Sequence, residues 1–340
     1  MDGIVTTSGP QLVQDDDLAL PDRVGEIAAS GAPARGVSLL GIPLGGGAAH
    51  PGTACGPAEL RAAGLAGALT AAGCTVADCG DVFVLPSAAM ATGLACGVRN
   101  GAVLRSWICA ISSHAYELAA SGTVPVFLGG DHSLSIGTIN GVGRFWERAG
   151  RPLFVVWIDG YADCEIPSTT RSGNLQAMAA AAVLGEPELK GLFAGGPQIA
   201  IAPDRFVPIG QRWIDAAEQA WLDRRGIAAI TMADLVDGRG LRALDALLDR
   251  VAACGGVIHA SIDVAVLGAA APSIARGAEP PRRRGACLRG VMERLARSKL
   301  VVSAELVELN PALDERPLSS GGAADLLVAL LGEPPARGRI

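Results

Sequence analysis

Short runs of apolar residues, rich in valine and isoleucine, recur along the chain between longer stretches rich in alanine and leucine. Apolar runs of this length are typical of strands that are buried on both faces. They predict strands over residues 37–44, 124–128, 154–158, 206–209, 227–230, 257–262 and 300–307. Strands that alternate with helical stretches form parallel sheets covered by helices. The pattern therefore predicts an α/β fold, a three-layer α/β/α arrangement with a mostly parallel, buried sheet.

Two helices have recognisable boundaries. Pro57 suits a first-turn position, where its missing N–H group is not needed, and Gly73 suits a helix end. Together they predict a helix over residues 58–72. A second helix is predicted over residues 133–141, directly after an Asp-His pair.

The first 35 residues differ from the rest of the chain. They contain Asp15-Asp16-Asp17, scattered glycine and proline, and little periodicity. We expect residues 1–35 to form a flexible N-terminal arm. Nothing within residues 36–340 resembles a linker, so this part is predicted to form a single α/β domain.

The charge balance narrows the range of partners. The chain has 34 acidic and 28 basic residues, a formal net charge of −6. There is no electrostatic reason to expect nucleic acid or an anionic membrane, and a small-molecule substrate is the expected partner. No segment offers the roughly 18 uninterrupted apolar residues of a membrane span. The eight cysteines lack C-x-x-C spacing and no signal-like segment opens the chain, which predicts a reduced, cytoplasmic setting.

Acidic and histidine residues follow four of the apolar runs. The four segments are Gly129-Gly130-Asp131-His132-Ser133, Asp159-Gly160-Tyr161-Ala162-Asp163, Ser261-Ile262-Asp263-Val264-Ala265 and Glu308-Leu309-Asn310-Pro311. Ligand sites of parallel sheets form beyond the carboxyl ends of the strands, so these segments are expected to meet. Carboxylates and an imidazole suit a hard divalent cation such as manganese or magnesium. The segments therefore predict a metal site.

These four segments, in this order, resemble those of the ureohydrolase family, which contains the arginases, agmatinases and formiminoglutamases. Further similar pieces are Gly41-Ile42-Pro43, the run from Gly56 to Arg61, Ser172-Gly173-Asn174-Leu175 and Gly210-Gln211-Arg212. The resemblance runs from about Gly36 to Gly332. It implies an arginase-like fold, hydrolysis of a C–N bond in a guanidino or amidino compound at two bridged Mn²⁺ ions, and a trimer or hexamer of identical chains.

The resemblance assigns ligands for a first metal ion, and all of them are present. They are His132, Asp159, Asp163 and Asp263. The alternating spacing of residues 159, 161 and 163 predicts that their side chains lie on one side of an extended segment. One Mn²⁺ ion is therefore expected at this half of the site.

The residues that bind only the second metal ion in the family are replaced in this chain. The resemblance places a histidine and an acid where this chain has Tyr161 and Ala265. A neutral tyrosine, with a pKa of about 10, is a poor ligand at neutral pH, and alanine offers no donor. The family's further catalytic histidine is Gln176 here, so that proton carrier is missing as well. We expect the second metal site to be empty.

The resemblance also suggests residues for catalysis and substrate binding. Asp163, Tyr161 and Glu308 are the predicted catalytic residues. Glu308 is expected to hold the guanidinium group and Asp215 the α-amino group, with Asn174 and Arg276 as further substrate contacts. Arg276 and the run Arg282-Arg283-Arg284 are predicted in a proline-rich loop. This loop is either a solvated basic face or a rim that favours a substrate carboxylate or phosphate.

Several other polar residues have structural explanations. Asp131 is either a metal ligand or an acid that caps a helix or supports the ligands. His259 lies alone in an apolar strand, which is typical of a hydrogen-bonded core histidine. Cys164 is expected in the core, facing away from the site. His50 and His114 belong to no motif.

Three functions are compatible with the sequence. The first is a divergent ureohydrolase-like hydrolase with a single Mn²⁺ ion. The second is metal-free acid and base chemistry, such as a cyclisation or elimination, in which some of the clustered carboxylates are protonated and Tyr161 is the donor. The third is a non-catalytic subunit that binds a ligand or another chain.

Overall fold

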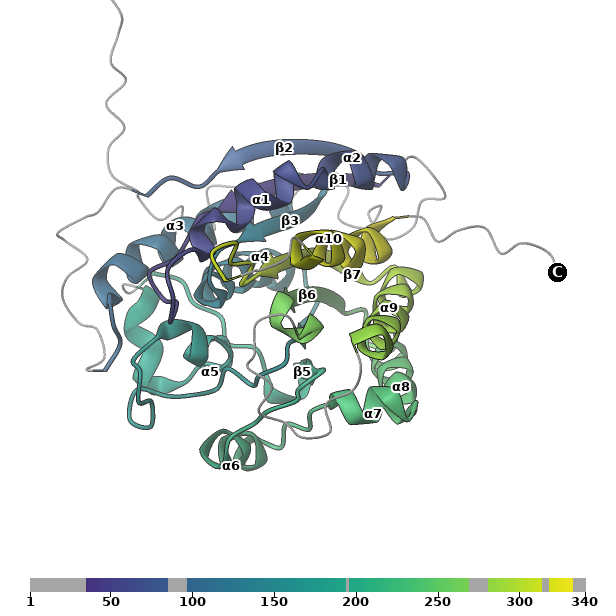
Figure 1. Cartoon of the computed structure of the whole chain (residues 1–340). Coiled ribbons are helices and arrows are strands. Elements are labelled where there is room, and N and C mark those ends of the chain that lie inside the picture. Colours follow the sequence, from purple (N-terminus) through teal and green to yellow (C-terminus); the bar gives the residue numbers. More distant parts are fainter. Residues whose placement is uncertain (1–34, 85–96, 194–195, 269–280, 314–317, 333–340) are drawn as a thin grey trace, which may run out of the picture.

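A parallel sheet forms the centre of the computed structural model, which describes residues 35–84, 97–193, 196–268, 281–313 and 318–332. Its seven strands all pair in parallel, in the order β2-β1-β3-β7-β6-β4-β5 (Figure 1). The strands are β1 (Gly36–Ile42), β2 (Thr75–Asp81), β3 (Val124–Gly129), β4 (Leu153–Ile158), β5 (Phe206–Ile209), β6 (Val257–Asp263) and β7 (Val301–Val307). The predicted three-layer α/β/α fold class is confirmed.

Helices cover both faces of the sheet. One apolar cluster is formed with α3 (Gly101–Ala120), α4 (Ser135–Arg148), α5 (Ala179–Val183) and α6 (Ala216–Arg225). The opposite cluster is formed with α1 (Gly56–Ala62), α2 (Leu65–Ala71), α7 (Met232–Val236), α8 (Arg239–Ala253), α9 (Pro281–Ser298) and α10 (Leu318–Leu331). Neighbouring residues of one strand contribute to opposite clusters, as Val155 and Val156 of β4 do, because strand side chains alternate between faces.

Six of the seven predicted strands are present, with ends that differ by no more than two residues. The strand predicted over residues 227–230 is wrong, because this segment makes only an isolated bridge between Ile230 and Ile209. Conversely, the apolar pattern did not predict β2. Most of its residues are exposed at the edge of the sheet, so its sequence lacks an apolar run.

The two predicted helices differ from the structure at their ends. The segment 58–72 forms two helices, α1 and α2, because Gly64 takes a left-handed conformation with φ of 81° between them. The second predicted helix begins with the short 3₁₀ turn His132–Leu134 and continues as α4 to Arg148. The predicted start is thus accurate to one residue, and the predicted end falls seven residues before Arg148.

Some sequence predictions fall outside the described residues, namely the flexible arm over residues 1–34 and the proposed role of Arg276. The prediction of a loop at Arg282-Arg283-Arg284 is wrong, because these residues lie in the first turn of α9. Arg284 is buried there, and its Nη2 donates to the carbonyl oxygen of Leu267 at 3.4 Å. Among the described residues, no helix has the length and apolar character needed to cross a membrane.

Candidate metal centre

The candidate metal ligands lie at the carboxyl ends of three strands of the sheet. His132 follows β3, Asp159 follows β4, and Asp263 is the last residue of β6. Strand β7 lies between β3 and β6 and ends directly before Glu308. These ends share one edge because the strands are parallel, so segments separated by more than a hundred residues meet there.

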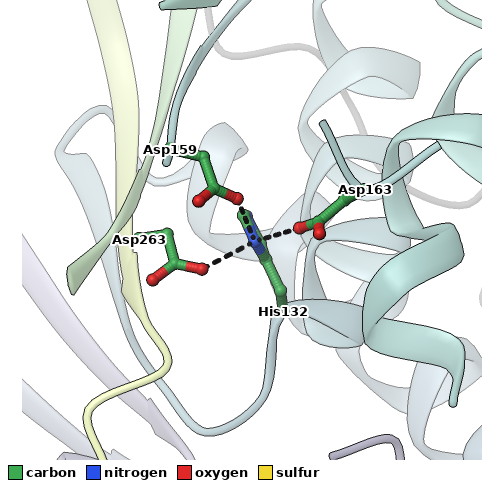
Figure 2. A group of neighbouring side chains, drawn as sticks. All are labelled: His132, Asp159, Asp163 and Asp263. Atoms are coloured by element: carbon green, nitrogen blue, oxygen red, sulfur yellow. Dashed lines mark ion pairs between the residues drawn. The ribbon is translucent and has the colours of Figure 1, made fainter. Parts of the chain in front are cut away.

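Three carboxylates surround one nitrogen of His132 (Figure 2). Its Nδ1 lies 2.9 Å from Oδ2 of Asp163, 3.4 Å from Oδ2 of Asp159 and 3.4 Å from Oδ2 of Asp263. The four ligand atoms all lie within 4.8 Å of one another. Neighbouring ligands of an octahedral cation with bonds of about 2.1 Å are separated by roughly 3 Å, so the spacing suits a divalent ion.

The remaining polar atoms of these ligands are held by other groups. The Nε2 of His132 lies 2.9 Å from Oγ of Ser261. Oδ1 of Asp159 accepts from the N–H group of Tyr161, and Oδ1 of Asp263 accepts from that of Ala265. A hydrogen bond at Nε2 leaves the Nδ1 lone pair free to bind a metal. His132, Asp159 and Asp263 are therefore each oriented by one atom and offer the other.

Two of the ligand atoms have no hydrogen-bond partner although they are buried. These are Nδ1 of His132 and Oδ2 of Asp159, in residues that are 1% and 0% exposed. Buried polar atoms without a partner are destabilising unless an ion or a water molecule satisfies them. The donor set, one imidazole and three carboxylates, suits a hard cation such as Mn²⁺. The residues present therefore fit the metal that the sequence predicts.

The three carboxyl groups of the cluster favour a positive charge beside them. Burial lowers the pKa of His132, but its contacts with Asp159, Asp163 and Asp263 raise this pKa well above its ordinary value. Burial and the charge of Asp159 raise the pKa of Asp163, and the same causes raise the pKa of Asp263 to about 6. A bound cation stabilises the ionised carboxylates and the neutral imidazole, so it can take the place of these protons.

Backbone geometry at the site differs from the extended segment that the spacing predicts. Strand β4 ends at Ile158, and Asp163 has a φ of 52°, so strand alternation does not extend to it. Glu308 also has a positive φ, of 64°. Such conformations are unfavourable for residues other than glycine and often occur at functional sites. Asp163 reaches His132 because the chain turns, and not because residues 159–163 form a strand.

The positions of the expected second metal site are close to the first. Tyr161 and Ala265 both line a pocket that also contains Asp163 and Asp263. Within the described residues, the only group of three or more metal-ligating side chains is that of His132. The structure therefore contains one candidate metal cluster in the part of the chain that it describes.

The pocket beside the cluster has a volume of about 390 Å³. Its wall combines acidic, polar and apolar residues from widely separated segments. They are Ala48, Ala49, His50, Thr53, Tyr161, Asp163, Glu165, Gln176, Ala177, Trp213, Asp215, Glu218, Asp263, Val264, Ala265, Glu308, Asn310 and Leu313. Such a mixture of polar and apolar groups is typical of small-molecule sites.

The predicted substrate contacts have different positions relative to this pocket. Glu308 lines it, and its Oε1 accepts from the N–H group of His132 at 2.6 Å. Asp215 also lines it, and its Oδ1 caps helix α6. Asn174 is not among the lining residues, and its Oδ1 accepts from Nη1 of Arg99 at 3.2 Å. The substrate-binding role of Asn174 stays a prediction.

Three other residues have the structural roles that the sequence suggested. Asp131 caps the turn at His132, because its side chain accepts from the N–H group of Ser133, and it is not part of the metal cluster. His259 is fully buried, and its Nδ1 lies 2.8 Å from Oγ of Ser303. Cys164 is buried, and burial together with the charge of Glu218 raises its pKa far above the ordinary value.

Sequence reasoning missed several pocket residues. His50 is exposed in the loop after β1 and lines the pocket although it belongs to no motif. Glu165, Glu218 and Trp213 line it as well. The position of Glu218 was detectable, because Asp215 and Glu218 have the three-residue spacing of a capping box, which the structure contains. No local pattern indicates that His50 or Trp213 faces this pocket.

Fold and site together define a class of protein, a three-layer α/β/α molecule with a cluster for a divalent cation at the carboxyl edge of its parallel sheet. A sequence model of the Arginase family matches residues 35–332. Arginases from Agrobacterium fabrum and Brucella melitensis are 36% and 37% identical, each over 86% of this chain and over 90% and 95% of their own lengths. The solved structure of Bacillus caldovelox arginase is similar with a TM-score of 0.75 at 28% identity, over 89% of this chain and 100% of that chain. The protein belongs to the arginase family.

Proposed function

We propose that the protein is a hydrolase that cleaves a C–N bond of a small guanidino or amidino compound, with one Mn²⁺ ion held by His132, Asp159, Asp163 and Asp263. The observation that carries the proposal is the unpartnered, buried Nδ1 of His132, which faces three carboxylate oxygens beside a pocket. Membership of a family whose named relatives are arginases supports the same reaction class.

The residues around the pocket have distinct proposed roles. Glu308 binds the positively charged guanidinium or amidinium group, because its half-buried carboxyl group lies at the pocket wall next to the cluster. Burial and the charge of Asp263 raise the pKa of Glu308, and a bound cation stabilises its ionised form. A divalent cation in the cluster supplies a positive charge that polarises a water molecule. Asp163 would accept a proton from the attacking water as the water oxygen adds to the amidino carbon. Asp163 would then pass this proton to the departing nitrogen, to which Tyr161 donates a hydrogen bond, so that the nitrogen leaves as an amine when the C–N bond breaks.

Metal analysis tests this proposal. We expect the purified protein, dialysed against Mn²⁺ and then against metal-free buffer, to retain about one ion per chain. Asp263→Ala should remove the ion, while Asp237→Ala, which changes an exposed acid outside the cluster, should keep it. The loaded protein is then screened for amine or urea release from guanidino compounds.

Each result separates the possible functions. One ion per chain together with hydrolysis supports the proposal. One ion without hydrolysis of any guanidino or amidino compound contradicts the reaction and favours a binding subunit. If no ion is retained, the proposed metal site is wrong and metal-free acid and base chemistry becomes the better hypothesis.

We also propose that the protein is a trimer or hexamer of identical chains, as the family resemblance implies. Sedimentation velocity tests this directly, because the mass of one chain is 34.4 kDa. A monomer at micromolar concentration would contradict the proposal.

A further inference from the structure

Large apolar side chains are exposed in the pocket beside the metal cluster. The large hydrophobic residues that are exposed in the described part of the chain are Phe83, Val103, Tyr161, Trp213 and Leu313. Three of these, Tyr161, Trp213 and Leu313, line that pocket, with exposures of 36%, 57% and 49%. Exposed apolar groups that gather in one concave site mark a contact for a ligand.

Trp213 is attached firmly to the loops of the metal site. The backbone N–H group of Trp213 donates to the carbonyl oxygen of Gly160 at 3.1 Å, and the backbone N–H group of Arg212 donates to the same oxygen at 2.8 Å. Nη2 of Arg212 donates to the carbonyl oxygen of Ala265 at 2.8 Å. The backbone of Trp213 is therefore tied to the loops that carry Asp159 and Asp263. Its indole ring is part of a preformed wall.

Leu313 reaches the pocket from a different segment. It follows Glu308 and Asn310, and its N–H group donates to the carbonyl oxygen of Asn310 at 3.1 Å. Nδ2 of Asn310 in turn donates to the carbonyl oxygen of Pro51, in the loop after β1. Two independent, hydrogen-bonded segments thus present apolar groups to one pocket.

The charges of the pocket select against anions. Six carboxyl groups line it, those of Asp163, Glu165, Asp215, Glu218, Asp263 and Glu308, and no lysine or arginine of the described residues does. Asp163 and Asp263 belong to the proposed metal site, and burial raises the pKa of Glu218 and of Glu308, so not all six act as free negative charges. The carboxylates that are ionised attract a cationic head and repel a ligand carboxylate.

We propose that the substrate is a guanidino or amidino cation without a carboxylate, whose body is apolar or aromatic and packs on Trp213 and Leu313. This proposal rests on the function proposed above and narrows it to a substrate class. The cationic head lies toward Glu308 and the metal cluster, and the apolar body lies toward the pocket mouth. The arrangement separates such compounds from free amino acids, which carry a carboxylate and a polar end.

Binding of three probes to the Mn²⁺-loaded full chain tests the proposal by calorimetry. The probes are 2-phenylethylguanidine, butylguanidine and arginine. We expect 2-phenylethylguanidine to bind about tenfold more tightly than butylguanidine, and arginine to bind least tightly. In Trp213→Ala the ratio of Kd between the first two probes should fall to about one. Leu313→Ala, a second variant if Trp213→Ala folds poorly, should reduce the ratio in the same direction.

Phe83→Ala is the matched control, because Phe83 is 82% exposed and does not line the pocket. It should leave all three Kd values unchanged. Glu165→Gln should strengthen arginine binding severalfold, since one negative charge is removed from the wall.

The outcomes distinguish this proposal from the hydrolase proposal. Selective binding without hydrolysis supports the substrate class and contradicts the reaction. The substrate class is overturned if arginine is the preferred substrate. It is also overturned if Trp213→Ala does not change the ratio of the Kd values of 2-phenylethylguanidine and butylguanidine. Either result, together with hydrolysis, leaves the hydrolase proposal intact. If Trp213→Ala changes the sedimenting mass and not the ratio, another copy of the chain contacts Trp213 and the proposal is wrong.

Discussion

We propose that Tyr161 and Ala265 limit the site to one metal ion. Both residues line the pocket next to Asp163 and Asp263, so a ligand at either position would face the same space. Ala265 also donates its N–H group to Oδ1 of Asp263, which orients that carboxylate. We propose that a second half-site lacks only the two donor side chains at these positions.

Restoring those donors should restore a second metal ion. We expect Tyr161→His combined with Ala265→Asp to raise the bound Mn²⁺ from about one to about two ions per chain, because an imidazole and a carboxylate are added beside the first cluster. Elemental analysis after dialysis measures the change. The matched control is Tyr161→Phe with Ala265→Asn, which adds no charge and should stay at one ion. A double variant with one ion would show that the alignment of these positions is wrong.

A second residue-scale feature is a charge buried within the sheet. Glu305 of β7 is fully buried, 3.4 Å from Nε2 of His259, and accepts from the hydroxyl groups of Ser135 and Thr138 at 2.5 Å each. Burial raises the pKa of Glu305, but the attraction of His259 and these hydrogen bonds lower it further, to about 2. The ionised carboxylate therefore stabilises the folded state.

The pH dependence of this stabilisation follows from the direction in which folding shifts the pKa of Glu305. The pKa of Glu305 is lower in the folded than in the unfolded chain, so its contribution is complete above about pH 5 and is lost as the pH falls towards 2. We expect Glu305→Gln to lower the free energy of unfolding by about 3 kcal/mol at pH 7, and by much less at pH 3. Urea denaturation at both pH values measures this. Glu147→Gln, at an exposed position, should show no such dependence, and an equal loss for Glu305→Gln at both pH values would contradict the argument.

At the scale of elements, the break between α1 and α2 depends on one glycine. Gly64 has a φ of 81°, and a Cβ atom added there would meet nothing within 4 Å. Gly67, three residues later and inside α2, also has open space around it. The two positions differ in backbone conformation, and this makes them a matched pair.

Alanine should have opposite effects at these two glycines. Gly64→Ala is expected to lower the free energy of unfolding by about 1 kcal/mol, because a left-handed conformation is unfavourable for alanine. Gly67→Ala is expected to raise it by up to about 1 kcal/mol, since alanine favours a helix interior. Urea denaturation of both variants checks the signs. A stabilised Gly64→Ala variant would mean that 58–72 can form one continuous helix, as the apolar pattern predicts.

For the whole molecule, we expect metal binding and folding to be coupled. The ligands come from strands β3, β4 and β6, so they form a site only when the sheet is assembled. An ion that binds the folded chain alone stabilises it by mass action, by about 2.7 kcal/mol at one hundred times Kd. The central strands should therefore unfold at a higher temperature when the cluster is loaded.

We expect added Mn²⁺ to raise the Tm by several degrees, and a chelator to reverse the change. His132→Ala should abolish the response, because it removes the ligand around which the carboxylates gather. His114→Ala, an exposed histidine of α3 outside the cluster, should respond as the unaltered protein does. A Tm that is insensitive to Mn²⁺ at millimolar concentration would count against the metal site.

The sequence by itself determined the parallel sheet and the order of the metal ligands. Both are local signals: buried strands are continuous apolar runs, and His132, Asp159 and Asp263 lie at or just after the ends of such runs. Asp163 is the exception, because a turn after β4 brings it to the site. Edge strand β2 gave no such signal because it is exposed, and the segment 227–230 gave a false one because four apolar residues do not specify a sheet neighbour.

Only the tertiary structure decided which residues share the pocket. His50, Trp213 and Leu313 lie in three loops far apart in sequence, and no local pattern links them. The same holds for Glu305 and His259, which become partners because β6 and β7 are adjacent in the sheet. The physical reason is that the periodicity of a strand specifies which faces are buried, whereas the neighbours of a loop residue depend on how separate strands and helices pack.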